Sequence, residues 1–255
     1  MAYTYDLHVH SCMSHDCKTS LKSLVSIVKR RGLNGIALTD HDTMEGVAKL
    51  QKIWPHEELQ LIAGCERTLD DGSHIIGLFI ERPPVSNLLR EVITEIQEQG
   101  GIVYLPHPFR NYAGLLRATS GYDSNDQAWA LEQTNIIEVY NHKCTPDENR
   151  KALELLDRYP KAFSAASDAH FAFQIGWGCT VYDQPLSVKV FSPITCYALV
   201  GAMDVQNVES ADEPQKPSIQ SIIKKILRAI GLFEPARAFR NYIRCFRKPN
   251  LQRYR

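Results

Sequence analysis

Short apolar runs alternate with longer segments of helical periodicity along the first 185 residues of the chain. The apolar runs predict strands at Tyr5–His10, Gly35–Asp40, Leu61–Leu69, His74–Ile80, Ile102–His107, Ile136–Asn141 and Ala162–His170. Between them, apolar residues that recur every three or four positions predict helices at Leu21–Arg31, Thr43–Trp54, Asn87–Gln99 and Pro146–Arg158. Strands that alternate with helices indicate βαβ units and a parallel sheet, either open or closed into a barrel.

A different pattern begins near residue 207. Asn207–Pro217 is polar and contains two prolines, which is typical of a linker. We therefore divide the chain into a main domain at 1–206, a linker at 207–217 and a tail at 218–255. The tail predicts an amphipathic helix whose apolar face consists of Ile219, Ile222, Ile223, Ile226, Leu227 and Ile230. Its other flank is basic.

Charge separates the chain at nearly the same place. The 29 Lys and Arg residues balance the 29 Asp and Glu residues, so the formal net charge is zero. Residues 1–215 hold 18 basic and 28 acidic side chains, a net charge of −10, whereas residues 216–255 hold 11 basic and one acidic, a net charge of +10. The balanced total therefore does not exclude an anionic partner. The basic tail is predicted to pack its apolar stripe on the main domain, to lie on an anionic membrane, or to contact a nucleic-acid backbone.

Composition excludes several classes of protein. With 44% hydrophobic and 23% charged residues, the chain is globular rather than disordered or collagenous. No apolar run reaches the about 18–20 residues that span a bilayer, and the first residues lack the basic and apolar regions of a signal peptide. The seven cysteines include no Cys-x-x-Cys pair, which fits a reducing compartment. We expect a cytoplasmic protein without a transmembrane segment, in which any peripheral membrane contact is made by the tail.

Histidines and acids gather at the ends of the predicted strands. His8 and His10 are two residues apart, so both side chains project from one face of the first strand, and Asp168 and His170 repeat this spacing on the last. Further candidates of the same kind are His41, Glu66, His74 and His107. Because sites in parallel α/β sheets and barrels lie at the carboxyl ends of strands, we expect these side chains to converge. Imidazole and carboxylate together are ligands of Zn, Mn and Fe, and a bridging carboxylate supports a site with several ions.

The segments that hold these residues resemble the motifs of a known family. In chain order they are DLHVHS (Asp6–Ser11), GLNGIALTDHDTMEG (Gly32–Gly46), IAGCE (Ile62–Glu66), GGIVYLPHPF (Gly100–Phe109) and SDAH (Ser167–His170). They resemble the motifs of the polymerase and histidinol phosphatase (PHP) superfamily, and most closely those of its small stand-alone phosphoesterases. The resemblance implies an α/β fold, a distorted (β/α)7 barrel with two or three divalent metal ions (Zn, Mn or Fe) at the carboxyl ends of its strands. The basic helical tail has no counterpart in these motifs.

The resemblance also implies which residues hold each ion. The first ion would be bound by residues of three motifs: His8, His10, Glu66 and Asp168. Glu66 would bridge to a second ion, held also by His74 and His107. A third ion would be bound by His41, His170 and one residue from the loop after His10. For that position we favour Asp16, which fits the family pattern Ser-x-Asp-small, over the alternative, His15. His56 and His142 match no ligand motif.

Residues next to these motifs are candidates for assisting the chemistry. Asp6 and Asp40 precede metal-site histidines and are predicted to orient imidazoles. Asp42 is predicted either to hold metal-binding side chains in place by hydrogen bonds or to accept a proton during the reaction. Arg110 lies three residues after His107 and is predicted either to clamp a substrate phosphate or to be a solvated loop arginine. Arg67 is a weaker candidate, because adjacent residues on a strand face opposite sides.

These features predict a metal-dependent phosphoesterase. A metal-activated hydroxide at a di- or trinuclear site would attack the phosphorus of a phosphomonoester or a nucleotide phosphate in line. The expected partner is thus a small phosphorylated substrate or a short nucleotide. Two alternatives are a non-catalytic metal-binding scaffold, which the intact ligand set disfavours, and a metal-dependent C–N hydrolase, which the order of the motifs disfavours. The sequence holds no Gly-x-Ser-x-Gly, P-loop or Gly-x-Gly-x-x-Gly motif for acyl, ATP or NAD chemistry.

Overall fold

The computed structural model describes residues 2–191 and 195–198. Within these residues the strands are β1 (Tyr3–Val9), β2 (Gly35–Leu38), β3 (Gln60–Thr68), β4 (His74–Leu78), β5 (Ile102–Leu105), β6 (Ile136–Asn141), β7 (Ala162–Ala166), β8 (Gly178–Tyr182) and β9 (Thr195–Ala198). The helices are α1 (Leu21–Arg30), α2 (Glu45–Leu50), α3 (Leu89–Glu98), α4 (Ser124–Gln133) and α5 (Pro146–Arg158), with a short 3-10 turn, η1, at Ala172–Gln174. The predicted linker at 207–217 and the basic tail at 218–255 lie outside the described residues.

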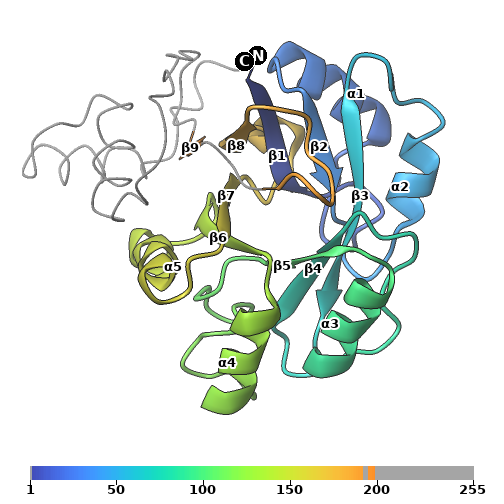
Figure 1. Cartoon of the computed structure of the whole chain (residues 1–255). Coiled ribbons are helices and arrows are strands. Elements are labelled where there is room, and N and C mark those ends of the chain that lie inside the picture. Colours follow the sequence, from blue (N-terminus) through green and yellow to red (C-terminus); the bar gives the residue numbers. More distant parts are fainter. Residues whose placement is uncertain (1, 192–194, 199–255) are drawn as a thin grey trace, which may run out of the picture. The chain divides into compact units, whose positions relative to one another are not determined.

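The strands form one curved sheet in the order β7-β6-β5-β4-β3-β2-β1-β8-β9. β7, at one end of this order, approaches β1 near the other end, because the backbone N–H of His10, just after β1, donates to the carbonyl of Ala169, just after β7, at 3.1 Å. On β8, the hydroxyl of Thr180 accepts from the N–H of Ala165 at 3.1 Å and contacts its carbonyl at 3.0 Å. The result is a nearly closed barrel with α1 to α5 on its outside (Figure 1). The predicted α/β barrel is confirmed.

The barrel departs from a regular parallel repeat at β4 and β8. β4 runs antiparallel to both β3 and β5, so the prediction of a parallel sheet is wrong for this strand, and β8, which was not predicted, runs antiparallel to β1. A parallel pair needs a crossover of about a dozen residues or more, whereas β3 and β4 are joined by a tight turn. In that turn the N–H of Leu69 donates to the carbonyl of Ser73 at 2.7 Å, and Gly72 supplies a φ of 81°. The antiparallel strands make the barrel distorted.

Helices α1 and α5 begin where the sequence supplies capping groups. At α1 the side chain of Ser20 accepts from the N–H of Ser23, and at α5 Thr145 and Glu148 form a reciprocal capping box. The predicted helix at Thr43–Trp54 is shorter in the structure, where α2 ends at Leu50. The reason is local, because a residue before a proline, here Trp54, avoids the helical conformation.

α4 and the strands after residue 170 were not predicted. α4 buries only Ala130 and Leu131, so its sequence lacks the repeated apolar positions that identify a helix. Its start is marked instead by Asp123, whose side chain accepts from the N–H groups of Asn125 and Asp126 at 2.8 and 2.9 Å. β8 is fully buried and pairs on both sides, so its residues do not alternate between apolar and polar.

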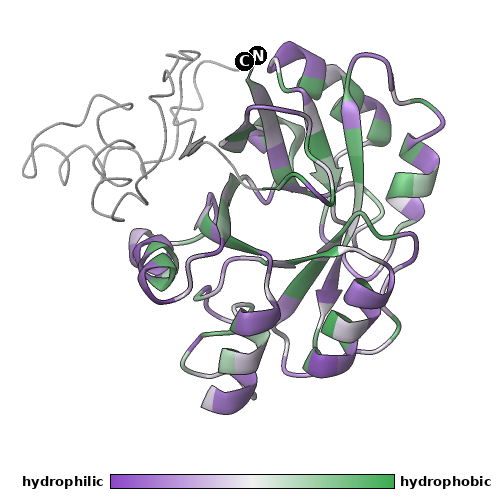
Figure 2. Ribbon diagram, in the orientation of Figure 1, coloured by the Kyte–Doolittle hydropathy of each residue, from purple (hydrophilic) through white to green (hydrophobic). Residues whose placement is uncertain are grey.

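Apolar side chains of the strands fill the core. One cluster includes Tyr5, Leu7, Ile62, Ile76, Leu78, Ile102, Tyr104, Ile136 and Tyr182, which come from β1, β3, β4, β5, β6 and β8. The strands are largely hydrophobic and the outward faces of the helices hydrophilic (Figure 2). This core supports one end of the barrel, where the polar side chains gather. In the part of the chain that the structure describes, no helix is long and apolar enough to cross a membrane.

Candidate metal centre

One end of the barrel brings together the histidines and acids of all five sequence motifs. His8 and His10 come from the end of β1, and Glu66 lies near the end of β3. His41, His107, Asp168 and His170 follow the ends of β2, β5 and β7, and His74 is the first residue of β4. His74 joins them although it begins its strand, because β4 is antiparallel to β3 and starts where β3 ends. His8, His10 and Glu66 are at most 1% exposed, so the centre of the group is removed from water.

Glu66 is the hub of this group. Its Oε2 lies 3.1 Å from Nε2 of His8, 3.2 Å from Nε2 of His10 and 3.4 Å from Nδ1 of His41. Its Oε1 lies 2.9 Å from Nδ1 of His74 and 3.1 Å from Nε2 of His107. The two oxygens therefore face two different sets of imidazoles. A carboxylate in this position can bridge two cations.

Asp168 and Asp16 extend the group on the other side. Oδ1 of Asp168 lies 3.3 Å from Nε2 of His10 and 3.8 Å from Nε2 of His8. Oδ2 of Asp16 lies 2.7 Å from Nε2 of His170 and 3.7 Å from Nε2 of His41. Asp168 and Asp16 thus contact two imidazoles each. Together with Glu66, these carboxylates connect all six histidines of the group.

The donor set fits divalent cations. Three buried imidazole nitrogens make no hydrogen bond of acceptable geometry among the described residues: His10 Nε2, His41 Nδ1 and His107 Nδ1. The first two lie 3.2 and 3.4 Å from Oε2 of Glu66 but are not directed at it as hydrogen-bond donors. Such atoms are costly to bury, so each one calls for a ligand. Four groups of three side chains have ligand atoms within 4.8 Å of one another, among them His8, His10 and Glu66. Imidazole and carboxylate donors at this spacing suit Zn, Mn or Fe.

Burial and charge set the protonation of these groups. Burial lowers the pKa of His41 to about 4 and also lowers the pKa of His107, so both rings are neutral, as metal-binding imidazoles must be. Burial alone would raise the pKa of Glu66, but the surrounding imidazoles, His8 first, hold it well below its usual value. Burial likewise lowers the pKa of His8, but Glu66, Asp168 and Glu138 outweigh it and raise the pKa well above its usual value. His8 must therefore release a proton to bind a metal ion.

Glu138, on β6, was missed by the sequence analysis. This fully buried carboxylate accepts from Nδ1 of His8 at 3.1 Å and from the backbone N–H of His107 at 2.6 Å. It also accepts from the hydroxyl of Tyr104 at 2.8 Å. A hydrogen bond to one ring nitrogen directs the other nitrogen toward a metal ion. The available signal was an acid inside the apolar run IIEVYN, which a buried strand tolerates only when the acid has partners.

Asp6 and Asp40, by contrast, contact no imidazole directly, and Asp40 reaches one only through Ser14. Asp6 accepts from the N–H groups of Ser167 at 3.0 Å and Gly176 at 2.8 Å, which ties β1 to the segments around β7 and β8. Asp40 accepts from Ser11 and from the hydroxyl of Ser14, and Ser14 in turn contacts Nδ1 of His10 at 3.2 Å. These carboxylates hold the loops that carry the histidines.

Two residues of the group have strained backbones. His107 has a φ of 28° and Asp168 a φ of 51°, the left-handed region that favours glycine. Each such residue costs about 1–3 kcal/mol and persists only where its surroundings enforce it. For His107, the bond from its N–H to Glu138 supplies part of that enforcement. From these two backbone positions, His107 contacts Glu66 at 3.1 Å and Asp168 contacts His10 at 3.3 Å.

Of the two predicted assisting residues, only Arg110 reaches this group. Its Nη1 donates to Oδ2 of Asp168 at 2.6 Å, and its side chain is 30% exposed. Asp42 faces away from the group and accepts from Nη1 of Arg67 and from the N–H of Thr68, both at 2.9 Å. Arg67 in turn donates to the carbonyl of Ser86 at 2.7 Å, on the side of β3 opposite Glu66.

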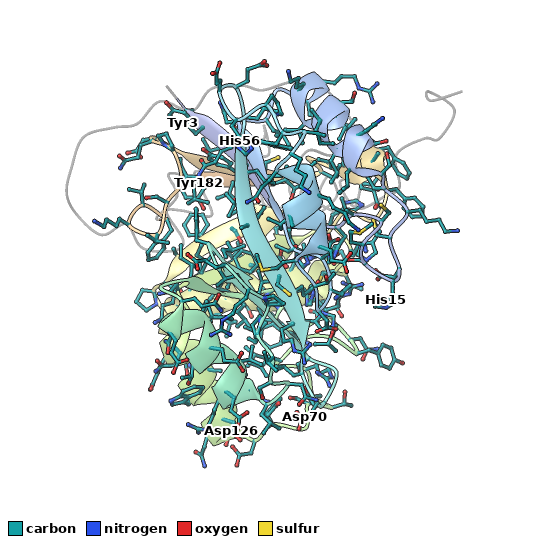
Figure 3. The ribbon with its side chains drawn as sticks, turned by 90° about the vertical axis from the view of Figure 1, so that its right-hand side faces the viewer. Tyr3, His15, His56, Asp70, Asp126 and Tyr182 are labelled. Carbon is teal, nitrogen blue, oxygen red and sulfur yellow. The ribbon has the colours of Figure 1, made fainter. Side chains whose placement is uncertain are left out.

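The remaining histidines lie at the edge of the group or apart from it. The ring of His15 lies 5.4 Å from the ring of His41, and its side chain is exposed. His56 lies at the opposite end of β3 from Asp70 (Figure 3), and its Nε2 contacts the carbonyl of Gln51 at 3.0 Å. His142 packs edge-on against the ring of Trp177 at 4.4 Å.

With this geometry established, comparison with known proteins assigns the chain to a family. Residues 6–232 match the PHP domain. The chain belongs to the PHP domain family. An uncharacterized protein of Methanocaldococcus jannaschii is 33% identical over 175 residues, which cover 67% of each of the two chains. A 5′-3′ exoribonuclease of Haemophilus influenzae is 35% identical over 95 residues, which cover 35% of this PHP chain and 34% of that enzyme.

Solved structures share the fold. A two-domain protein of Bacteroides vulgatus, described as containing a PHP-like metal-dependent phosphoesterase, has a TM-score of 0.57 and 21% identity, covering 68% of this chain and 54% of that one. A protein of Bifidobacterium adolescentis, described by analogy as a metal-dependent phosphoesterase, has a TM-score of 0.54 and 16% identity, covering 66% of this chain and 88% of that one. The PHP chain thus spans about half of the Bacteroides protein and a third of the exoribonuclease. Family and donor set together support a metal-dependent hydrolase.

Proposed function

We propose that this PHP protein is a metal-dependent phosphoesterase that hydrolyses a phosphomonoester or a nucleotide phosphate. The observation that carries the proposal is the buried group around Glu66, in which three imidazole nitrogens have no hydrogen-bond partner among the described residues. A set of buried polar atoms without partners destabilises the fold unless a ligand satisfies it. Divalent cations are the ligands that imidazoles and carboxylates satisfy together.

The contacts support the assignment of the ligands to two or three ions. We assign His8, His10, Glu66 and Asp168 to the first ion. Glu66, His74 and His107 are assigned to the second, and His41, His170 and Asp16 to the third. Asp16 is preferred to His15 because its Oδ2 lies 2.7 Å from Nε2 of His170 and 3.7 Å from Nε2 of His41, whereas the ring of His15 approaches only the ring of His41 among the described residues, at 5.4 Å.

Residues of the chain complete the chemistry of such a site. Bound divalent ions would acidify a water molecule and neutralise phosphoryl oxygens. Glu138 holds the ring of His8 through Nδ1 and leaves Nε2 for a cation. Arg110 uses one N–H on Asp168, and its remaining donors are available to a phosphoryl oxygen. The contacts of Asp42 with Arg67 and Thr68 favour a supporting role for Asp42 over proton transfer.

The test is a substrate screen combined with metal analysis. The protein is stripped with a chelator, reloaded with Mn, Zn or Fe, and assayed with phosphomonoesters, 3′,5′-bisphosphonucleosides and short oligonucleotides. His8→Ala and Asp168→Asn are expected to abolish hydrolysis and reduce bound metal, while His56→Ala, at an exposed position with no contact to the group, retains both. Full activity in either of the first two variants contradicts the site. Bound metal without turnover indicates the scaffold alternative, and hydrolysis of amides alone indicates a C–N hydrolase.

The predicted partners of the basic tail need a separate experiment, because residues 218–255 lie outside the described part of the chain. Binding of the full chain to RNA and to anionic liposomes is measured at rising salt concentration. A steep salt dependence with RNA alone supports nucleic-acid contact, and binding to liposomes alone supports peripheral membrane contact. Binding to neither favours a tail that packs on the main domain.

A further inference from the structure

Asp168 lies between two cations that come from different loops. Arg110, after β5, donates from Nη1 to Oδ2 at 2.6 Å. Lys143, in the turn between β6 and α5, places Nζ 3.4 Å from Oδ1 and also donates to Nδ1 of His170. The side chain of Lys143 is only 20% exposed. Asp168 carries one negative charge and also faces His8 and His10, so two further partly buried cations call for another explanation.

The turn that carries Lys143 is held rigidly. The N–H of Lys143 donates to Oδ1 of Asn141 at 2.8 Å, and the N–H of Cys144 donates to the carbonyl of Asn141 at 3.1 Å. Asn141 is itself held by Asn149, since its N–H donates to Oδ1 of Asn149 at 2.9 Å and its carbonyl accepts from Nδ2 of Asn149 at 3.1 Å. The backbone of Lys143 is therefore held beside the metal centre by hydrogen bonds.

A cation on His170 would release Lys143 from one of its partners. Nδ1 of His170 lies near Nζ of Lys143 and 3.0 Å from the carbonyl of Asp168. When Nε2 of a neutral imidazole donates its lone pair to a metal ion, the ring proton resides on Nδ1. Nδ1–H then donates to the Asp168 carbonyl and cannot accept from Lys143. The ammonium group is left with free N–H donors at the edge of the centre.

The charge of the loaded centre favours an anion with more than one negative charge. Four carboxylates face the group: Asp16, Glu66, Glu138 and Asp168. Two divalent ions balance these four charges, so Arg110 and Lys143 then give the centre an excess of positive charge. A phosphomonoester, whose second pKa is about 6, is mostly a dianion with three non-bridging oxygens at neutral pH. A phosphodiester carries only one negative charge and two non-bridging oxygens.

We propose that Lys143 is a substrate-binding residue that contacts the terminal phosphoryl group together with Arg110 and makes the protein select phosphomonoesters over phosphodiesters. The inference rests on the proposed function and narrows it to substrates with a terminal phosphate. The guanidinium supplies directed N–H donors and the ammonium a compact charge. Together they bind two oxygens of the terminal phosphoryl group, on the side of the centre where Asp168 lies.

The test compares two substrates in Lys143→Met and Lys143→Arg. The full-length protein loaded with Mn is assayed with 4-nitrophenyl phosphate and bis(4-nitrophenyl) phosphate. In Lys143→Met we expect kcat/KM to fall about 10–100-fold for the monoester, the effect of one charged hydrogen bond, and less than about threefold for the diester. Lys143→Arg is expected to restore most of the monoester rate. Binding of inorganic phosphate to the metal-loaded protein, measured by calorimetry, should weaken in Lys143→Met by the same factor.

The control is Lys151→Met, on the exposed face of α5, where Lys151 is 48% exposed and pairs with Asp147. It is expected to leave both rates and the bound metal unchanged. Equal losses for both esters together with lost metal in Lys143→Met would overturn the inference, because Lys143 would then only position Asp168 and His170. A wild type that prefers the diester would also overturn it.

A wild type without any turnover contradicts the proposed function, and the calorimetry then decides the inference separately. Phosphate binding that is weaker in Lys143→Met than in the wild type supports the inference even in that case. Equal phosphate affinity in the two proteins overturns it.

Discussion

Two carboxylates near the end of β3 have opposite kinds of surroundings. Asp71, in the turn to β4, accepts from the N–H and hydroxyl of Ser73 at 2.7 and 2.8 Å, from the N–H of Gly121 at 2.9 Å and from Nη2 of Arg117 at 3.2 Å. Each of these partners is a hydrogen-bond donor. Glu66 faces imidazoles, and nitrogens of His10 and His41 remain without a hydrogen-bond partner.

The difference teaches how to separate a structural polar cluster from a binding site. Both carboxylates are shielded from water, with side chains 10% and 1% exposed for Asp71 and Glu66. The donors around Asp71 satisfy it, so the cluster ties two loops together and needs nothing more. The group around Glu66 is complete only when a cation joins it. Burial and polarity are shared, and the unsatisfied atoms are what distinguish the two clusters.

The largest expected effect is that of Glu66→Gln. Replacing the bridging carboxylate removes one charge and one donor from the first and second ions, so we expect bound metal and hydrolysis to fall more than the about 10–100-fold that follows loss of a residue orienting a ligand. Metal content is measured by elemental analysis and hydrolysis with the best substrate of the screen. Retained metal at wild-type stoichiometry would remove Glu66 from the ligand set.

The next effect is on folding and concerns Asp71→Ala. Removing this carboxylate leaves Arg117, which is 7% exposed, without its charged partner, and we expect a loss of about 3 kcal/mol in the free energy of unfolding. Urea denaturation gives the value. Metal bound per folded molecule should stay at the wild-type level, unlike in Glu66→Gln. A variant that keeps full stability but loses metal would reverse the comparison.

A smaller effect is expected for Glu138→Gln, which tests the contact between a carboxylate and an imidazole of the centre. The amide keeps the shape but weakens the bond to Nδ1 of His8, so metal affinity should fall about 10–100-fold. Competition with a chelator measures the affinity. The matching change Asp42→Asn is expected to leave metal affinity unchanged, because the contacts of Asp42 are Arg67 and Thr68. Equal effects at both positions would show that Glu138 does not act through His8.

The smallest effect is the pH dependence of the Asp71 cluster. Burial raises the pKa of Asp71, but hydrogen bonds from Ser73, Gly121 and Ser120 outweigh it, and the pKa lies below its usual 3.8. A carboxyl group with a depressed folded-state pKa stabilises the fold above the unfolded value and loses that contribution as the pH falls through the folded value. Urea midpoints of the wild type should thus fall more steeply below about pH 4 than those of Asp71→Asn. Parallel curves would contradict this origin of the acid dependence.

The sequence predicted the strand ends that form the site better than it predicted the sheet. The spacings of His8 with His10 and of Asp168 with His170 place each pair at one end of its strand, and the structure brings both pairs together. The direction of β4 could not be read in this way, because an apolar run looks the same in both directions. Yet that direction decides whether His74 reaches Glu66 at 2.9 Å or lies at the far end of the barrel.

The residues that support the site were harder to find than the residues within it. The sequence marks Glu138 as unusual, because it is an acid within an apolar strand. Nothing in the sequence marks Lys143, because a lysine in a turn is usually solvated. Asp6 and Asp40 stand close to histidines in the sequence but bind backbone and serine groups instead. Distance along the chain says little about side-chain contact between strands, since the register of the sheet sets it.

By itself, the sequence determined the α/β class, the five motifs and the set of imidazoles and carboxylates, because periodicity and residue chemistry are local properties. Tertiary structure alone decided that the sheet curves until β7 lies beside β1 and that β4 runs antiparallel to its neighbours. It also decided that Glu66 stands among five imidazoles while Asp71 stands among donors. These facts depend on contacts between distant segments, and only the folded, nearly closed barrel makes those contacts.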